Sequence, residues 1–139
     1  MKKILKLIPL VLLAVTLNSC DEDLASGATD TVGFEDSTAD VGVNVGEETE
    51  EVIFVYTGNV TSGDRTFSVS VDAEATTADP TAYDVPSQVV IPGGTNVGEL
   101  PVFLRDINLG DGVSIVLNLA SEGSTVLLQD TITINVTQV

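Results

Sequence analysis

The sequence predicts an all-β domain, a two-sheet antiparallel sandwich, and three observations lead to that prediction. From Thr31 onward, apolar and polar residues alternate with a period of two in short segments, as in half-buried strands. Gly, Pro, Asn and Asp bound these segments, and no stretch between them has a helical period. Several segments are too apolar to leave one face wet, so two sheets packed face to face are expected.

The expected strands differ in how clearly they alternate. Four segments alternate with one buried face, and Val116, on the second face of its segment, indicates a central or doubly covered strand. Residues 51–56 form a continuous apolar run, whereas Pro92-Gly93-Gly94 ends a short strand. The clearest segments are 51–56, 66–71, 88–91, 100–104, 113–119 and 131–137. With the weaker segments they amount to about seven or eight strands, so residues 31–139 are predicted to form one immunoglobulin-like sandwich of roughly 100 residues.

The start of the chain carries a different pattern. Lys2, Lys3 and Lys6 precede an apolar run that stops at Leu17-Asn18-Ser19-Cys20, the site of the only cysteine. The run contains Pro9 and is shorter than about 20 residues, the length that a membrane-spanning helix needs. The pattern resembles the signal peptide of bacterial lipoproteins.

This resemblance implies that residues 1–19 are removed and that Cys20 is acylated. Two or more acyl chains anchor a protein durably to a lipid bilayer, each buried CH₂ contributing about 0.8 kcal/mol. Residues 20–30 are small and polar, so they are expected to form a flexible tether. Asp21-Glu22-Asp23 resembles the signal by which Bacteroidota lipoproteins are exported to the outside of the outer membrane. The alternative is that these acids only keep the tether solvated.

The charge of the chain excludes several classes of partner. All 21 acidic residues follow Cys20, where Arg65 and Arg105 are the only cations, so the net formal charge there is −19. Binding to phosphate backbones needs clustered Lys and Arg, and anionic headgroups repel such a surface. We therefore expect no nucleic acid and no direct contact with a lipid surface, but cationic partners are favoured.

The residue inventory also argues against an enzyme. The chain has no histidine, and no lysine follows Cys20, so Ser-His-Asp, Cys-His and Ser-Lys catalysis and His-Cys zinc sites are excluded. Only a pair of carboxylates, as in glycosidases, stays available. Sugar clefts are usually lined by aromatic rings, and this chain has 4 Phe, 2 Tyr and no Trp. A carboxylate glycosidase is thus a remote alternative.

A longer pattern resembles a known domain family. Asp79-Pro80-Thr81-Ala82-Tyr83-Asp84-Val85-Pro86 is followed by Val89-Val90-Ile91-Pro92-Gly93-Gly94-Thr95 and by Leu100-Pro101-Val102-Phe103-Leu104-Arg105-Asp106. This layout, with Val45-Gly46-Glu47 upstream, resembles the Calx-beta domain and similar Bacteroidota lipoprotein domains. The resemblance implies an immunoglobulin-like sandwich over nearly all of residues 31–139.

Calx-beta domains can bind calcium through acids at one end of the sandwich. The resemblance maps these acids onto Glu47, Asp84, Asp106 and Asp111. The sequence departs from the pattern, because Ile107 replaces the second of two aspartates and the Asp-Tyr pair is reversed as Tyr83-Asp84. Calcium takes about six to eight oxygen ligands, and these departures remove acids that would supply them. We therefore expect no required cofactor, and calcium binding is kept as an alternative. Asp84, Asp106 and Asp111 are otherwise expected to cap turn amides.

Three tripeptides resemble acceptor sites for O-glycosylation in Bacteroidota. Asp30-Thr31-Val32 and Asp36-Ser37-Thr38 lie beside the expected tether, so Thr31 and Ser37 are the candidate acceptors. Asp130-Thr131-Ile132 is expected to lie within a strand.

Two classes of function are open at this point. The first is a non-catalytic, lipid-anchored module of the cell envelope that binds a protein or glycan partner or serves a surface complex. The second is a calcium-responsive adhesion or structural module. Because function on such folds lies in the loops, residues 73–84 are the candidate binding region.

Overall fold

A computed structural model describes residues 29–105, 112–121 and 123–139. These residues form ten strands and one short 3₁₀-helix, η1. The elements are β1 (Thr31–Phe34), β2 (Thr38–Val43), β3 (Glu48–Thr57), β4 (Arg65–Val71), η1 (Pro80–Ala82), β5 (Tyr83–Asp84), β6 (Gln88–Ile91), β7 (Val97–Arg105), β8 (Val113–Ala120), β9 (Val126–Leu127) and β10 (Thr131–Gln138).

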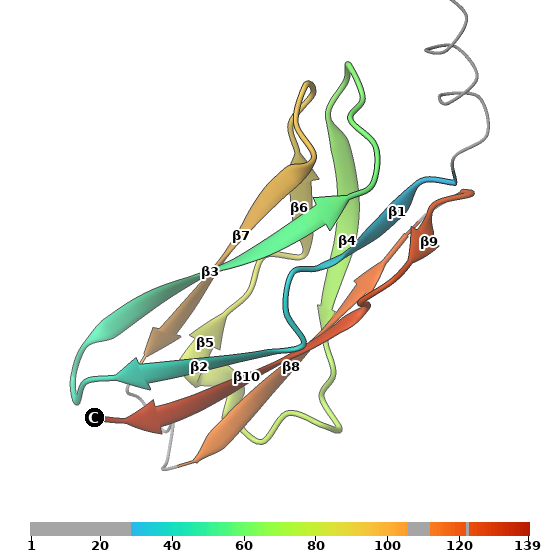
Figure 1. The fold of residues 1–139 in the computed structure, drawn as a ribbon. Helices are drawn as coiled ribbons and strands as arrows, with labels where there is room; N and C mark the ends of the chain where they lie inside the picture. The colour runs from blue at the N-terminus through green and yellow to red at the C-terminus, as the bar shows by residue number, and fades with distance from the viewer. Residues whose placement is uncertain (1–28, 106–111, 122) are drawn as a thin grey trace, which may run out of the picture.

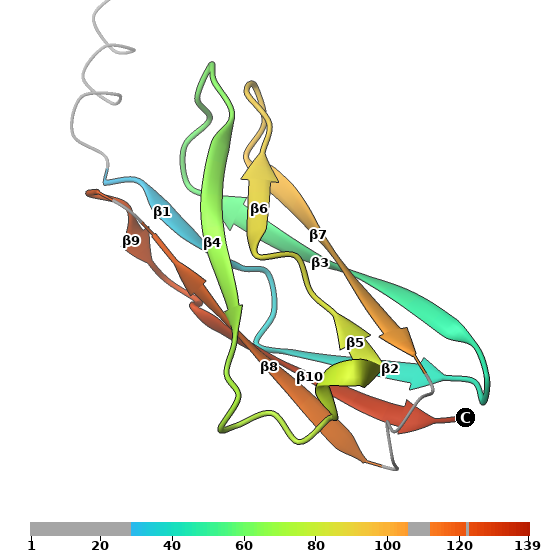
Figure 2. The same cartoon turned by 180° about the vertical axis from the view of Figure 1, so that it is seen from behind.

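The strands build two five-stranded sheets that pack face to face. Sheet A has the order β5-β7-β3-β1-β9 and sheet B the order β2-β10-β8-β4-β6. Strand β3 crosses in front of β4 in Figure 1 and behind it in Figure 2, so the sheets form separate layers. This confirms the predicted two-sheet sandwich.

The expectation of a wholly antiparallel sandwich of about seven or eight strands was wrong in two respects. Strands β5 and β9 have two residues each, too few for alternation to show in a sequence. Two pairs are parallel, β1 with β9 and β2 with β10. They arise because the chain runs from β1 in sheet A to β2 in sheet B, where β2 lies beside the last strand.

The core lies between the sheets and follows the predicted alternation. Leu100, Val102 and Leu104 of β7 in sheet A and Ile115 and Leu117 of β8 in sheet B are all fully buried. Strand β8 lies between β10 and β4, so the prediction of a central strand at Val116 is confirmed.

Strand β3 contains the continuous apolar run noted in the sequence. The apolar run at 51–56 is not buried on both faces. Ile53 and Val55 are buried, but Phe54 and Tyr56 between them are 36% and 39% exposed on the outer face of sheet A.

Two loops at one end of the sandwich hold each other. Gly93 donates from its amide to Asp64 Oδ1 over 2.8 Å, and Gly94 to the carbonyl of Thr61 over 2.7 Å. A Cβ at Gly93 would lie 2.3 Å from the carbonyl oxygen of Ser62, so only glycine permits this approach. The start of β1 lies toward this end and the C-terminus toward the other (Figures 1 and 2).

Candidate functional site

The first candidate region is the Arg105 end, defined by Glu48, Asp84 and Arg105. Register places Glu48 of β3 directly opposite Arg105 of β7, and β5 pairs with the same part of β7. Arg105 Nε donates to Glu48 Oε2 over 3.0 Å, and its Nη2 pairs with Asp84 Oδ2. The hydrogen bond to Asp84 is the main cause that raises the pKa of Arg105.

The acids nominated from the Calx-beta resemblance are not gathered by the described residues. Glu47 lies in the turn before β3, where its Oε2 accepts a hydrogen bond from Asn44 Nδ2 over 2.9 Å. Its neighbour Glu48 is the acid that reaches Arg105. Asp106 and Asp111 lie outside the described residues.

A calcium site does not fit what is described at this end. Calcium needs about six to eight oxygens, several of them from carboxylates. Here a guanidinium lies between Glu48 and Asp84. Within residues 29–105, 112–121 and 123–139, no three His, Cys, Asp or Glu side chains form a group suited to a metal ion.

Of the three aspartates expected to cap turns, only Asp84 is among the described residues, and two other aspartates cap turn amides. Asp84 pairs with Arg105 instead of capping an amide. Asp72 Oδ1 accepts from the amides of Glu74 and Ala75, and Asp79 Oδ1 accepts from the amide of Thr81 over 2.9 Å. That backbone hydrogen bond is the main cause that lowers the pKa of Asp79.

Much of the candidate region 73–84 serves the fold itself. Thr77 donates from its amide to the carbonyl of Ser114 over 2.9 Å, and Val116 donates from its amide to Thr76 Oγ1 over 3.0 Å. Ala78 and Ala82 are buried in the core. This segment is therefore fixed along β8, although most of its residues stay exposed.

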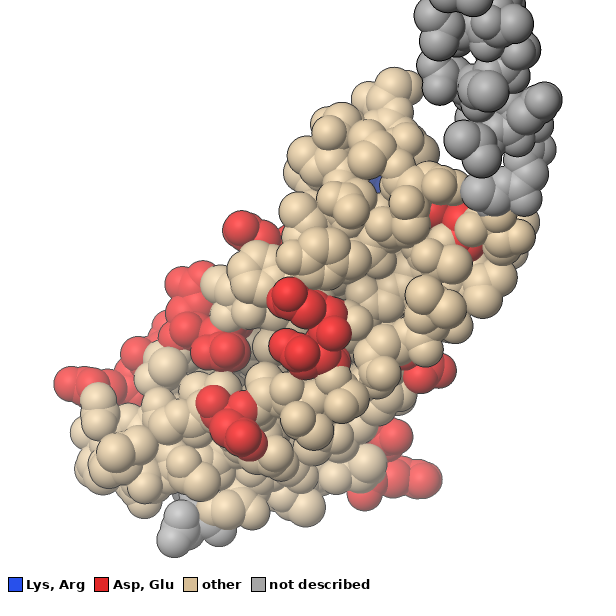
Figure 3. Space-filling view, in the orientation of Figure 1, with Lys and Arg blue, Asp and Glu red and all other residues tan. Residues whose placement is uncertain are grey.

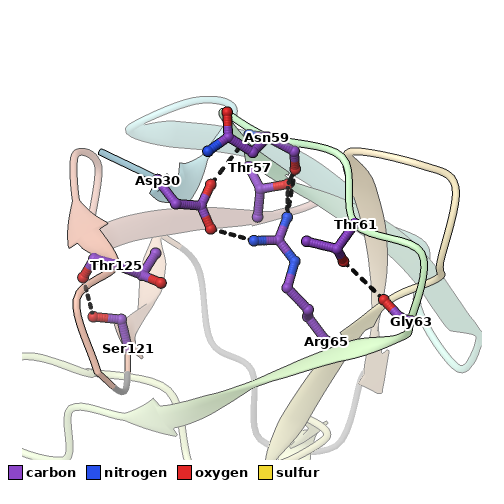
Figure 4. Close-up of polar contacts among 8 residues, drawn as sticks. All are labelled: Asp30, Thr57, Asn59, Thr61, Gly63, Arg65, Ser121 and Thr125. Carbon is purple, nitrogen blue, oxygen red and sulfur yellow. Dashed lines mark hydrogen bonds and ion pairs between the residues drawn. The ribbon is translucent and has the colours of Figure 1, made fainter. Parts of the chain in front are cut away.

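The second candidate region is the Arg65 end, defined by Asp30, Thr57, Asn59 and Arg65 (Figure 4). Arg65 Nη1 pairs with Asp30 Oδ2, and Arg65 Nη2 donates to Thr57 Oγ1 over 2.5 Å and to the carbonyl of Asn59 over 2.6 Å. Asp30 Oδ1 in turn accepts from the amide of Asn59 over 3.1 Å. The folded part therefore begins no later than Asp30, which the sequence had placed in the tether.

This cluster joins the two sheets. Arg65 begins β4 of sheet B, whereas Thr57 ends β3 of sheet A and Asp30 precedes β1 of sheet A. Thr57 is only 4% exposed, and Arg65 Cζ lies 6.0 Å from the centre of the buried Phe67 ring. Figure 3 shows Arg and Lys atoms only as a small recessed spot at this end. The guanidinium is thus a structural group and is not presented to a ligand.

The third candidate region is the outer face of sheet A, which sequence reasoning missed. Register places Tyr56 opposite Val97, Phe54 opposite Glu99 and Glu50 opposite Phe103. Apolar and acidic side chains therefore alternate across β3 and β7 at the surface. The apolar run at 51–56 hid this face, because an outer position held by Phe or Tyr looks the same in sequence as a buried one.

The outer face of sheet B has a different composition. Its strands present mostly hydroxyl and amide side chains, and Asn135 Nδ2 donates to Asp40 Oδ1 over 2.9 Å between β10 and β2. Its outward residues include Thr38, Thr66, Ser68, Ser70, Gln88, Ser114, Asn118, Thr133 and Asn135. Among the described residues, exposed aromatic rings are therefore a particular feature of the outer face of sheet A.

The remaining nominated residues have separate outcomes. Cys20 lies outside the described residues. Thr31 is partly buried, and its Oγ1 would lie 2.6 Å from a Cβ at Gly58, whereas Ser37 is exposed in the β1–β2 connection. In the part of the chain that the structure describes, no helix has the length and apolarity to cross a membrane.

Comparisons with known proteins rest on structure alone. No protein-family model matches the chain, and no curated protein matches it in sequence. The apo-form Calx CBD1 domain matches with a TM-score of 0.63 and 13% identity, over 81% of this chain and 99% of that one.

Longer structures match as well. CBD12 from CALX1.2 gives a TM-score of 0.63 and 15% identity, over 78% of this chain and 44% of that one. A putative carbohydrate binding protein from Bacteroides ovatus ATCC 8483 gives 0.60 and 16%, over 77% of this chain and 36% of that one. The chain thus spans less than half the length of these two, and identities this low establish the fold alone. The described residues form a Calx-beta-like β-sandwich, a fold that this chain shares with domains of Bacteroides proteins.

Proposed function

We propose that this chain is a non-catalytic binding module of the cell envelope, anchored through an acylated Cys20 and exposed on the outer membrane. The observation that carries the binding role is the outer face of sheet A. Phe54 and Tyr56 are more than one third exposed there, although each could bury a large apolar area. Exposed rings gathered on one face are typical of interaction surfaces.

The anchor and the Arg65 end support each other in this proposal. A tether from Cys20 would enter the domain at Asp30, which Arg65 ties to both sheets. A pull on the tether would then be shared by the two sheets instead of acting on β1 of sheet A alone. This end would face the membrane, and the Arg105 end would point away from it.

The alternatives lack such support. Glu48 and Asp84 are bridged by Arg105, so they do not face each other across an open cleft as the two carboxylates of a glycosidase do. The same bridge disfavours a calcium-responsive module.

The anchor is tested by feeding cells that express the full chain an alkyne-tagged palmitate. Label on the protein and its recovery with outer membranes are expected, and Cys20→Ala should abolish both. Protease added to intact cells should digest the labelled protein. An unlabelled wild-type protein in the soluble fraction would contradict the anchor, and protection from protease would contradict surface exposure.

A further inference from the structure

We propose that the outer face of sheet A docks a basic, partly apolar segment of a partner protein. The inference deepens the proposed function and rests on it. The juxtaposition that carries it centres on Phe54, whose ring lies on the central strand β3. Glu99 of β7 is directly opposite Phe54, and on the other side Glu35 donates from its amide to the carbonyl of Phe54 over 3.0 Å. An exposed ring therefore has an exposed acid at each side, Glu99 on β7 and Glu35 just after β1.

The apolar surface continues along β3 in both directions. Tyr56 is opposite Val97 at one side of Phe54, and Val52 is opposite Pro101 at the other. All four side chains are at least partly exposed. The face thus offers a row of apolar contacts along one strand, bordered by carboxylates.

The negative charge of this face favours a partner that carries basic side chains. Its only basic side chain is Arg105, which is already paired with Glu48 and Asp84. Glu35, Glu50 and Glu99 have no ion-pair partner among the described residues. Covering a carboxylate with an apolar partner is costly unless a compensating charge arrives with it. Arg or Lys meets both needs, because it pairs with carboxylates and is attracted to the face of an aromatic ring.

The size of the face favours a segment over a globular surface. Glu48 to Tyr56 spans about 27 Å at a rise of about 3.4 Å per residue, and the adjacent strands β7, β3 and β1 together span about 10 Å. A standard protein interface buries about 800 Å² on each partner, well above this area. A single extended segment of alternating basic and apolar residues matches both the length and the pattern.

A neutral glycan is the less favoured occupant. Sugar rings stack on aromatic side chains but carry no charge to balance three carboxylates. In Figure 3 the acidic side chains gather mainly over the lower and middle parts of the view. Charge complementarity therefore assigns the face to a basic protein segment.

The test uses residues 21–139, which contain both sheets and the described core, as a soluble protein. Its probes are an eight-residue peptide alternating Arg and Leu, the same peptide with Gln for Arg, and cellohexaose. Amide chemical shifts from NMR locate each contact. The Arg peptide should shift the amides of β3 and β7, and the Gln peptide should bind at least about tenfold more weakly.

Matched variants decide between specific docking and general attraction. Glu99→Gln and Glu35→Gln should each weaken the Arg peptide about fivefold, and Phe54→Ala about as much. Glu74→Gln removes the same charge from an exposed loop elsewhere and should change nothing. Equal effects of Glu74→Gln and Glu99→Gln, or shifts spread over all acidic regions, would overturn the proposal. Shifts on this face with cellohexaose alone would replace it by glycan binding. None of these outcomes alters palmitate labelling, which tests the anchor separately.

Discussion

The two ends of the sandwich use the only two cations of the domain in opposite ways. Arg65 is 18% exposed and reaches from sheet B to three acceptors, which lie in β3 of sheet A, just after β3 and just before β1. Arg105 is 34% exposed, and both of its partners, 50% and 63% exposed, lie in its own sheet. One arginine joins the layers, and the other neutralises neighbouring acids at a wet edge.

The difference teaches where a charge can stabilise a sandwich. Exposed ion pairs contribute about 0 to 1 kcal/mol, because water screens them and side-chain entropy opposes them. Removing one partner of a buried pair costs about 3–5 kcal/mol, since polar groups are left without partners. The Arg65 end lies between these limits and nearer the second, because Thr57 beneath it is buried.

The largest effect is expected from Arg65→Ala. The change leaves Asp30 and the buried Thr57 hydroxyl without their donor and should lower the free energy of unfolding by about 2–3 kcal/mol. Urea unfolding followed by circular dichroism measures this quantity. Arg105→Ala is the matched control and should cost less than about 1 kcal/mol. Equal losses in the two variants would break the comparison.

The next largest loss of stability is expected where the β3–β4 and β6–β7 loops meet near the Arg65 end. Gly93→Ala would place a methyl group 2.3 Å from the carbonyl oxygen of Ser62, so the loops must separate. We expect a loss of about 1–3 kcal/mol, as for other overpacked sites. Gly63→Ala is the control, because a Cβ there meets nothing within 4 Å. Melting temperatures of both variants provide the test, and an unchanged Gly93→Ala would show that the loops do not pack closely.

A smaller effect is expected from pH, near the Arg105 end. Asp79 precedes the strand that brings Asp84 to Arg105, and its folded pKa is lowered from 3.8 by the amide of Thr81. Its stabilising effect is therefore complete above pH 3.8 and is lost as the pH falls through the lower folded pKa. The melting temperatures of wild type and Asp79→Ala should converge in acid. A gap that widens on acidification would show the opposite sign.

The smallest effect is expected from calcium. If calcium bound to the folded protein, a calcium concentration of 100 times the dissociation constant would raise the free energy of unfolding by about 2.7 kcal/mol. Arg105 already neutralises Glu48 and Asp84, so millimolar calcium should leave the melting temperature within about 1 °C of the value with chelator. A melting temperature several degrees higher with calcium would contradict this account and would indicate a calcium site in the domain.

The sequence was a good guide to the core and a poor one to the sites. Strict alternation at 66–71 and 131–137 identified buried faces, because one buried face forces polar residues onto the other. Phe54 and Tyr56 escaped notice, since apolar residues at outer positions remove that contrast.

Long-range pairings left no local signal either. Asp30 and Arg65, 35 residues apart in the chain, meet only because β1 and β4 begin close together in different sheets. Asp84 looked like a turn residue, and its pairing with Arg105 depends on the register of a two-residue strand. Short strands and cross-sheet contacts are set by tertiary packing and not by local pattern.

A pair of double-mutant cycles tests most directly the claim that Arg65 joins the sheets while Arg105 only neutralises charge. One cycle combines Arg65→Ala with Asp30→Ala, the other Arg105→Ala with Asp84→Ala, each measured by urea unfolding. We expect a coupling energy of about 1–3 kcal/mol in the first cycle and below about 0.5 kcal/mol in the second. Additive losses at Arg65 and Asp30, or equal couplings at the two ends, would contradict it.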